Sequence, residues 1–433
     1  MGSMSWLNLM SLAGFVAFGV IAWLVGGRKR PFPKRTVIGA SALMAGLGVV
    51  VFVVPQTRTV LLWANDVVLA VLSGANAGAE FLFGPLALSP GQSTPGGEPS
   101  VGFVLAAQIL PAVVFFASIM AVLYHLRLLQ PVVHALGRVF RRTLGLSGAE
   151  ALAGSANVFF GVESAMTVRP YLERMTRSEL LTVLTCGMST VASTTLAIYV
   201  LFLKDSFPQI AGHLISASVL SIPAAVLVSK LLLPETETPE TMGEVPPVAE
   251  GERHRNSIAA LAAGSWDGLK LAAGISTLLI AVLGVVGVLN FALAKLGTVG
   301  GEPLSFSLIL GWIFTPVAWL LGIESGDTQA AGQLLGQRLI LTEIPAYREL
   351  GALAQQGALS ARSVVVLSYA LCGFTHVASM GIFVGGFSAL APTRRDDLAA
   401  LGPRALLGAV LATLMTGALA GILFHGQTGL IAN

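Results

Sequence analysis

Charged residues are scarce in this sequence. Asp, Glu, Lys and Arg together make up 11% of its 433 residues, whereas soluble domains contain about 25%. Mean hydropathy is correspondingly high, at +0.80. This composition excludes an ordinary soluble domain and indicates an integral membrane protein. Apolar runs of about 20 residues predict spanning helices, and the alternating short strands of an outer-membrane barrel are missing, so we expect an all-α membrane fold.

Cysteine and net charge are also low. The two cysteines, Cys186 and Cys372, lie inside apolar runs, which excludes a disulfide framework and favours small packing residues. A formal charge of +3 is too small to indicate a nucleic-acid partner. The sequence contains neither a His-Glu-x-x-His metal motif nor a Gly-x-Ser-x-Gly nucleophile turn, so we expect neither an enzyme nor a resident cofactor. An intramembrane enzyme that uses Glu163 and His376 is a weaker alternative.

One polar, interrupted segment occurs twice in the chain. In the first copy a Gly-Val-Glu-Ser turn at 161–164 breaks an apolar run, and 186–193 (Cys-Gly-Met-Ser-Thr-Val-Ala-Ser) follows inside a second run. In the second copy Glu343 lies in an apolar break, and 372–379 (Cys-Gly-Phe-Thr-His-Val-Ala-Ser) repeats the pattern. Paired, interrupted hydrophobic segments in two halves of a membrane chain are typical of the midplane binding site of a transporter. The sequence therefore predicts a transporter.

Eight transmembrane helices and two re-entrant hairpins account for the apolar runs. The expected spans are 6–25, 37–54, 101–126, 180–203, 210–233, 269–296, 363–390 and 405–424. Gly, Asn, Glu and Pro interrupt 144–172, and a similar break interrupts 333–353, so we expect both segments to be hairpins that enter and leave on one side. We expect 58–87, which glycines interrupt, and 306–323 to be interfacial helices.

Basic clusters give the orientation of these segments. The loops at 28–35, 134–142 and 394–404 are rich in Lys and Arg, so the positive-inside rule places them in the cytoplasm and both termini outside. The two hairpins then start on opposite faces of the membrane, which makes the two copies an inverted repeat. A hydrophilic linker at 234–255 separates them.

Polar side chains gather at the breaks of both copies. Glu163 and Glu343 have apolar neighbours, and a carboxylate at membrane depth marks a substrate or ion path by default. Free helix ends at hairpin tips can bind polar ligands through backbone groups. His376 can donate, accept or titrate near neutral pH. Another set offers oxygen atoms to a monovalent cation or a sugar hydroxyl, or serves only helix packing: Asn157, Ser164, Ser189, Thr190, Ser193 and Thr194.

Several further motifs resemble one family. In chain order they are 169–172 (Arg-Pro-Tyr-Leu), 175–180 (Met-Thr-Arg-Ser-Glu-Leu), 267–271 (Asp-Gly-Leu-Lys-Leu), 368–374 (Ser-Tyr-Ala-Leu-Cys-Gly-Phe), 385–386 (Gly-Gly) and 389–392 (Ala-Leu-Ala-Pro). On these motifs the chain from about 101 to 424 resembles the concentrative nucleoside transporter family. The resemblance implies uptake of nucleosides across the inner membrane, driven by a sodium or proton gradient, by a homotrimer in the lipid bilayer. A passive channel is an alternative, although hairpins with carboxylates favour alternating access.

The resemblance also implies that each protomer holds a scaffold and a moving transport domain that contains both hairpins. We expect scaffold helices at 4–126 and 259–304, and a transport domain built from the two repeats at 127–233 and 305–425. Residues 234–258 are then the linker between the halves.

The site residues of the family carry over with changes. The resemblance implies substrate contacts from Val162, Glu163, Ser164, Thr195, Glu343, Phe374, His376 and Ser379. It implies a sodium site formed by Asn157, Phe160, Thr190 and Val191, and sodium ranks slightly ahead of a proton. His376 stands where the family has Asn, and Val162, Glu163 and Ser164 stand where it has the Gln-Thr-Glu that reads the nucleobase. Hydrogen-bonding sites reject ligands that leave their polar groups unpaired, so a nucleoside analogue or another polar glycoside is the alternative substrate.

Overall fold

The computed structural model describes residues 5–28, 31–88, 92–93, 97–246, 255–299 and 301–426. Helices dominate this part, which also contains the short antiparallel strands β1 (Thr298–Val299) and β2 (Glu302–Pro303). Several described stretches are long and apolar enough to cross a membrane: Trp6–Val25, Lys34–Val53, Asp66–Ala87, Leu105–His125, Ile210–Leu232 and Pro392–Leu423. The helical membrane fold expected from composition is confirmed, while the number of eight spans stays a prediction.

The N-terminal helices follow the apolar runs, with one correction. Helix α1 (Trp6–Val25) and helix α2 (Lys34–Val53) lie where two spans are expected. Helix α3 (Pro55–Phe83) continues through Gly74 and Gly78, so the expected breaks there are wrong, and its second half is apolar enough to span. A glycine costs a helix only about 1 kcal/mol relative to alanine, so the flanking residues hold the helix together. The 3₁₀ turn η1 (Gly84–Ala87) begins where Gly84 adopts a φ of +54°.

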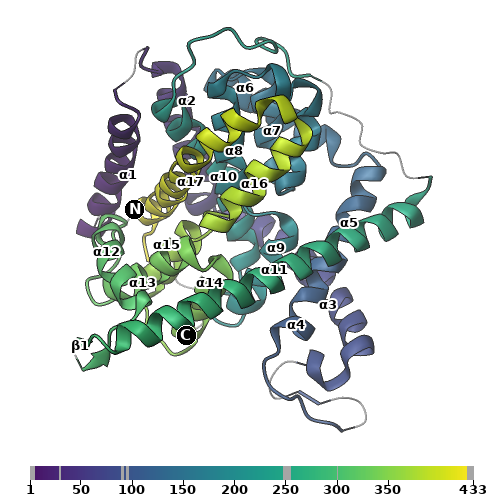
Figure 1. The fold of residues 1–433 in the computed structure, drawn as a ribbon, viewed down its shortest axis with the longest axis vertical. Coiled ribbons are helices and arrows are strands. Elements are labelled where there is room, and N and C mark those ends of the chain that lie inside the picture. Colours follow the sequence, from purple (N-terminus) through teal and green to yellow (C-terminus); the bar gives the residue numbers. More distant parts are fainter. Residues whose placement is uncertain are drawn as a thin grey trace.

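A long helix crosses beside the third span. Helix α5 (Leu110–His125), which follows the short α4 (Leu105–Gln108), packs on α11 (Ser257–Ala294), and α11 runs obliquely past α5 and α3 in Figure 1. Close packing needs small residues, because a Cβ on Gly264 or Gly268 would lie 2.7 Å from backbone atoms of α5. Helix α12 (Phe306–Leu320) follows β2 and packs on the second repeat.

Each of the two expected repeats contains two helical arms where a hairpin is expected, two shorter helices and a long helix. The first has α6 (Gln130–Leu144), α7 (Gly148–Asn157), the 3₁₀ segment η2 (Val162–Arg174), α8 (Arg177–Ser189), α9 (Ser193–Leu203) and α10 (Ile210–Leu232). The second has α13 (Thr328–Ile340), α14 (Glu343–Gln355), α15 (Ala361–Ala370), α16 (Val377–Leu390), η3 (Pro392–Arg394) and α17 (Arg395–Leu423). The expected fourth and seventh spans, 180–203 and 363–390, are each broken into two helices, as the resemblance implies. Pro170 lacks an N–H, and the arm that contains it is 3₁₀ and not α-helical.

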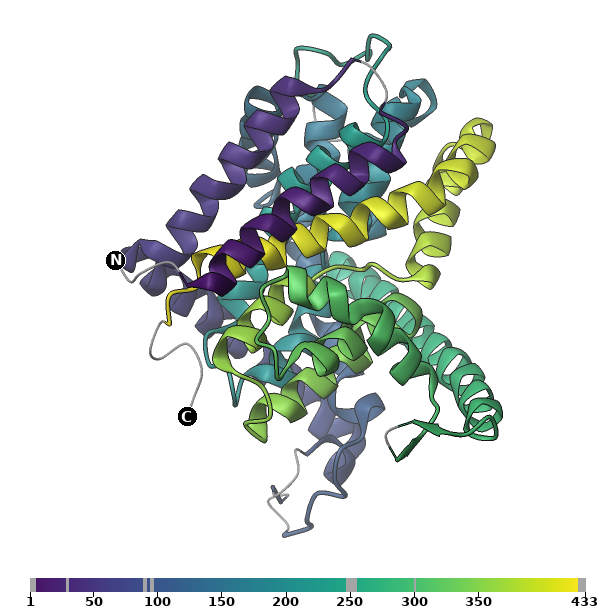
Figure 2. The same cartoon turned by 90° about the vertical axis from the view of Figure 1, so that its left-hand side faces the viewer.

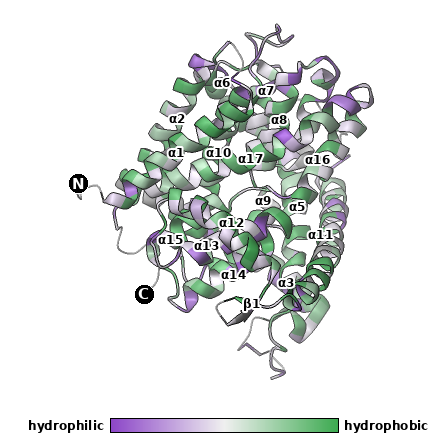
Figure 3. Cartoon of the chain, turned by 60° about the vertical axis from the view of Figure 1, so that its left-hand side comes forward, coloured by the Kyte–Doolittle hydropathy of each residue, from purple (hydrophilic) through white to green (hydrophobic). Residues whose placement is uncertain are grey.

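The long helices of the two repeats form the centre of the molecule. Helix α17 packs on α10 and α8, and α1 lies along α17 on the outside (Figure 2). Helix α2 covers α10 in the same way. Figure 3 shows hydrophobic residues along α1, α2 and α10 and hydrophilic residues in the loops at the ends of the bundle.

Buried charges fasten the first hairpin to its repeat. Ser147 and Glu150 form a capping box at the start of α7, which satisfies two free N–H groups there. Lys230 of α10, which is also buried, places its Nζ 2.5 Å from Glu150 Oε1 and 2.9 Å from the Ser178 hydroxyl of α8. This pair connects α7, α8 and α10 inside the protein.

The described part of the hydrophilic linker is folded onto the protein. The N–H of Gly148 donates to the Thr241 carbonyl at 2.9 Å, and the N–H of Ala149 donates to the Thr241 hydroxyl at the same distance. Glu240 pairs with Arg174 at 2.8 Å. The linker therefore covers the start of the first hairpin up to residue 246 (Figure 1).

Candidate functional site

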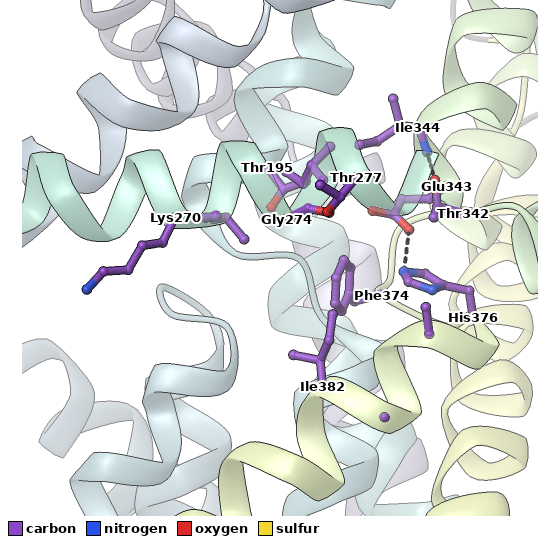
Figure 4. Close-up of a pocket in the computed structure, with 14 residues that line it drawn as sticks. Thr195, Lys270, Gly274, Thr277, Thr342, Glu343, Ile344, Phe374, His376 and Ile382 are labelled. Carbon is purple, nitrogen blue, oxygen red and sulfur yellow. Dashed lines mark hydrogen bonds and ion pairs between the residues drawn. The ribbon is translucent and has the colours of Figure 1, made fainter. Parts of the chain in front are cut away.

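Glu343 is the first residue of α14 and is completely buried. Thr342 before it has a φ of +150°, a region that side chains rarely adopt, and such strained residues gather at functional sites. The Tyr199 hydroxyl donates to Glu343 Oε1 at 2.8 Å. The Nε2 of His376 lies 3.3 Å from Oε2 (Figure 4), an ion-pair distance at which neither atom has a hydrogen-bond partner in the described structure. Oε2 and Nε2 therefore contact each other, and Oε2 can accept a further hydrogen bond from a ligand.

The backbone of α16 fixes the tautomer of His376. His376 caps α16, and its Nδ1 accepts a hydrogen bond from the Ser379 N–H at 3.1 Å. The Ser379 hydroxyl donates to the His376 carbonyl at 2.7 Å. Because Nδ1 is an acceptor, the proton of the neutral ring lies on Nε2 and points toward Glu343. The site thus presents an acceptor and a donor side by side.

A pair of tyrosines supports the carboxylate from behind. The Tyr199 and Tyr347 rings stack with centroids 4.1 Å apart and planes 7° from parallel. The Tyr347 hydroxyl donates to the Ser368 carbonyl at 2.6 Å, which ties the pair to α15. Both tyrosines are fully buried. This support restricts the orientation of the Tyr199 hydroxyl and hence of Glu343.

The two broken helices meet next to this site. The N–H of Phe374, in the break between α15 and α16, donates to the Thr190 carbonyl, in the break between α8 and α9, at 3.2 Å. Gly373 allows this approach, since a Cβ there would lie 2.5 Å from Thr413 Cγ2 and 3.0 Å from the Ser189 carbonyl oxygen. The repeated motif therefore comes together in space.

A cavity of about 590 Å³ opens in front of Glu343. Four of the expected substrate residues line it, namely Thr195, Glu343, Phe374 and His376 (Figure 4). The opposite wall is α11, which contributes Leu271, Gly274, Ile275 and Thr277. The volume falls within the range of about 300–1,000 Å³ of small-molecule sites. Small-molecule sites orient their ligands with a few polar groups in an otherwise apolar wall, and this cavity has that character.

The remaining expected substrate residues lie elsewhere. Ser379 is buried and contacts His376, so it reaches the cavity only through that ring. Ser164 is buried, and its hydroxyl donates to Asn157 Oδ1 at 2.7 Å. The side chains of Val162 and Glu163 lie outside the described residues. Their role in the first hairpin stays a prediction.

The expected sodium residues lie in two segments of the chain and make separate contacts. Asn157 is fully buried and bonds to Ser164 and, at 2.9 Å, to the Ala153 carbonyl. The Thr190 hydroxyl donates to the Cys186 carbonyl at 3.0 Å. Phe160 is half-buried at the hairpin tip, and Val191 is buried in the break of α8 and α9. Their use as one cation site stays a prediction.

Comparisons with known proteins identify the family. Profiles described as "Na+ dependent nucleoside transporter N-terminus", "Nucleoside recognition" and "Na+ dependent nucleoside transporter C-terminus" match residues 13–86, 106–206 and 213–421. The uncharacterized transporter YutK of Bacillus subtilis is 36% identical over 416 residues, which cover 96% of this chain and 99% of YutK. This chain belongs to the Na⁺-dependent nucleoside transporter family.

Other members of the family agree along the whole chain. Nucleoside permease NupC of Helicobacter pylori is 32% identical, with 96% of this chain and 97% of NupC covered. The structure of CNTnw in an inward-facing substrate-bound state is 35% identical, has a TM-score of 0.88 and covers 98% of this chain and 99% of CNTnw. A substituted CNTnw in an outward-facing state has a TM-score of 0.87, covering 97% of this chain and 98% of that one. The resemblance found in the sequence is therefore confirmed.

Three kinds of site residue were not expected from the sequence. Tyr199 and Tyr347 lie in runs that read as plain packing, although a buried tyrosine needs a hydrogen-bond partner and this need is a usable signal. Leu271 and Thr277 follow a family motif but carry no chemistry that marks them. Arg338 is a fully buried cation in the second hairpin, and a charged residue inside an apolar segment could have been singled out.

Proposed function

We propose that this protein is a secondary active carrier that takes up nucleosides, or close analogues of them, together with sodium. The observation that supports this most is the pair formed by Glu343 Oε2 and His376 Nε2, which are buried, adjacent and without hydrogen-bond partners in the described structure. A sugar hydroxyl can donate to the carboxylate and accept from the imidazole at the same time. Oε2 faces only His376 and keeps a lone pair for another donor, so a ligand with hydroxyls is favoured.

The sugar is recognised better than the base in this proposal. Glu343, His376 and Thr195 supply polar contacts at one end of the cavity, and Phe374 supplies a ring against which a base can pack. The family's amide at the first hairpin is replaced by Val162. The substrate is therefore a ribose-type nucleoside or a polar glycoside whose base is read loosely.

Sodium is the proposed coupling ion. Asn157 and Thr190 offer neutral oxygens, with carbonyls of Phe160 and Val191, which suit a monovalent cation. Proton coupling through Glu163 is the alternative.

Alternating access, assembly and location complete the proposal. The cavity lies between α11 and the two repeats, so movement of the repeats past α11 would expose it to either side. Residues 127–233 and 305–425 are the proposed moving domain. We place the protein in the inner membrane as a homotrimer, with both termini outside, and apolar residues exposed on α11, such as Ile280 and Val288, would face lipid or a partner subunit.

Replacing Glu343 tests the grip on the sugar. Glu343→Gln keeps the shape but removes the charge and one acceptor, so uridine uptake into liposomes should fall about tenfold to a hundredfold, as expected for loss of charged hydrogen bonds. Glu349→Gln, on the same helix but outside the cavity lining, is the matched control and should transport normally. Unchanged uptake by a correctly folded Glu343→Gln protein would exclude this role.

A further inference from the structure

Arg338 carries a positive charge into the protein core. It lies on α13, the first arm of the second hairpin, and its side chain is 1% exposed. A guanidinium stays charged in proteins, and burying it without compensation is costly. Its Nη1 donates to the Ala370 carbonyl and, at 2.9 Å, to the Thr413 hydroxyl, while its Nε has no hydrogen-bond partner in the described structure. Its hydrogen-bond partners are thus neutral groups.

The position of these partners explains what the charge does. Ala370 is the last residue of α15, just before the break, so its carbonyl lies at the negative end of a helix that stops inside the protein. Arg338 therefore caps the broken helix of the second repeat. Glu343 begins the other arm of the same hairpin, and its negative charge interacts electrostatically with Arg338, although no ion pair joins the two side chains in the described structure.

The first repeat lacks this device. Its corresponding arm, α7, has the sequence GAEALAGSAN, with no cationic residue and with neutral Asn157 at the tip. The one charge of that arm, Glu150, is already paired with Lys230 at the far end. The break between α8 and α9 accordingly receives no side-chain cation from α7.

We propose that Arg338 is the fixed cation of the second repeat: it neutralises Glu343 and the broken end of α15, so that only the first repeat takes up an exchangeable cation. This inference rests on the proposed sodium coupling. It follows that one sodium ion accompanies each substrate molecule, because the second cation is covalently part of the chain.

Three substitutions separate the charge from the hydrogen bonds. Arg338→Lys keeps the charge, Arg338→Gln keeps donors for Ala370 and Thr413 without the charge, and Arg338→Met keeps neither. The matched control is Arg362→Gln, because Arg362 is a second buried arginine that caps other groups, among them the Gly322 and Gly421 carbonyls, near the opposite end of α15. Uridine uptake and binding are measured in each purified protein as functions of sodium concentration and of pH.

The fixed charge predicts a distinctive pattern. Wild type, Arg338→Lys and Arg362→Gln should depend on sodium with a Hill coefficient of about one, whereas Arg338→Gln and Arg338→Met should need a second cation and approach about two. Acquired dependence on protons would also support the proposal, since Glu343 would then be protonated; the other titratable groups facing it are Tyr199, Tyr347, His376 and Cys372.

Several results would overturn the proposal. One is a folded Arg338→Gln protein that keeps the wild-type sodium and pH dependence, or that no cation restores. Another is a folded Arg338→Lys protein that behaves like Arg338→Gln, since this would make the hydrogen bonds and not the charge decisive. Absence of sodium-driven uptake in wild type would instead refute the proposed function itself, so the two failures are distinguishable.

Discussion

At the scale of residues, Tyr199 holds one oxygen of Glu343 and leaves the other for a ligand. The hydroxyl reaches Oε1 at 2.8 Å from α9, whereas His376 faces Oε2 from α16. A carboxylate fixed on one side loses less rotational freedom when a substrate binds, so binding is stronger. Tyr199 is therefore a positioning residue and does not itself line the cavity.

Removing the Tyr199 hydroxyl should weaken substrate binding more than it weakens the protein. For Tyr199→Phe we expect the KM for uridine to rise about tenfold, because a hydrogen bond to a charged group contributes about 1.5–3 kcal/mol. The maximal rate should change little, and the Tm should fall no further than in Tyr369→Phe. An unchanged KM in folded protein would show that the hydroxyl does not position Glu343.

Tyr369→Phe is the control for that substitution. Its hydroxyl bonds to His213 at 2.8 Å and to Ser216 at 2.7 Å, both on α10 and away from the cavity. We expect this variant to lower the Tm and to leave the KM unchanged. The split between KM and Tm distinguishes positioning from simple packing.

Some of these residues could be predicted from the sequence and others could not. Glu343 and His376 could be predicted as site residues because ionisable side chains inside an apolar run are costly and mark a functional site. The partnership of Tyr199 with Glu343 joins positions 144 apart in the chain, so no local pattern reveals it. Ser379 was predicted to contact substrate, but its place in the cap of α16 follows from the fold of the break and could not be seen beforehand.

At the scale of elements, the two broken helices form one unit. The bond from the Phe374 N–H to the Thr190 carbonyl joins breaks that belong to different repeats. Free helix ends need such partners, because each leaves N–H and C=O groups unpaired. The repeated Cys-Gly motif predicted that both segments matter. The fourth and seventh spans were expected to be broken, but the tertiary contact that replaces the missing helical bonds could not be predicted.

The contact between the two breaks depends on the small size of Gly373. Gly373→Ala would bring a Cβ to 2.5 Å from Thr413 Cγ2, which forces atoms apart. We expect a loss of about 1–3 kcal/mol in unfolding free energy, as for other overpacked sites, and a lower Tm. Gly385→Ala on α16, where a Cβ would meet nothing within 4 Å, should be neutral or stabilising. Equal Tm values for the two variants would contradict the proposed packing.

At the scale of the whole molecule, composition predicts a helical membrane protein, whereas the position of the cavity depends on how the helices pack. An apolar chain with few charges predicts membrane helices, and the long continuous helices α1, α2 and α10 lie close to the predicted ranges. The cavity wall supplied by α11 could not be predicted, because it depends on how α11 packs on α5 through Gly264 and Gly268. The same packing places α11 next to the two repeats, which are the proposed moving domain of a carrier.

Transport by purified protein in liposomes tests this account most directly. Labelled uridine and adenosine are followed under an inward sodium gradient, an inward proton gradient and no gradient. The account predicts accumulation above the external concentration with the sodium gradient, and equilibration at most without it. Accumulation driven by protons alone, or equilibration that no gradient alters, would contradict a sodium-coupled carrier.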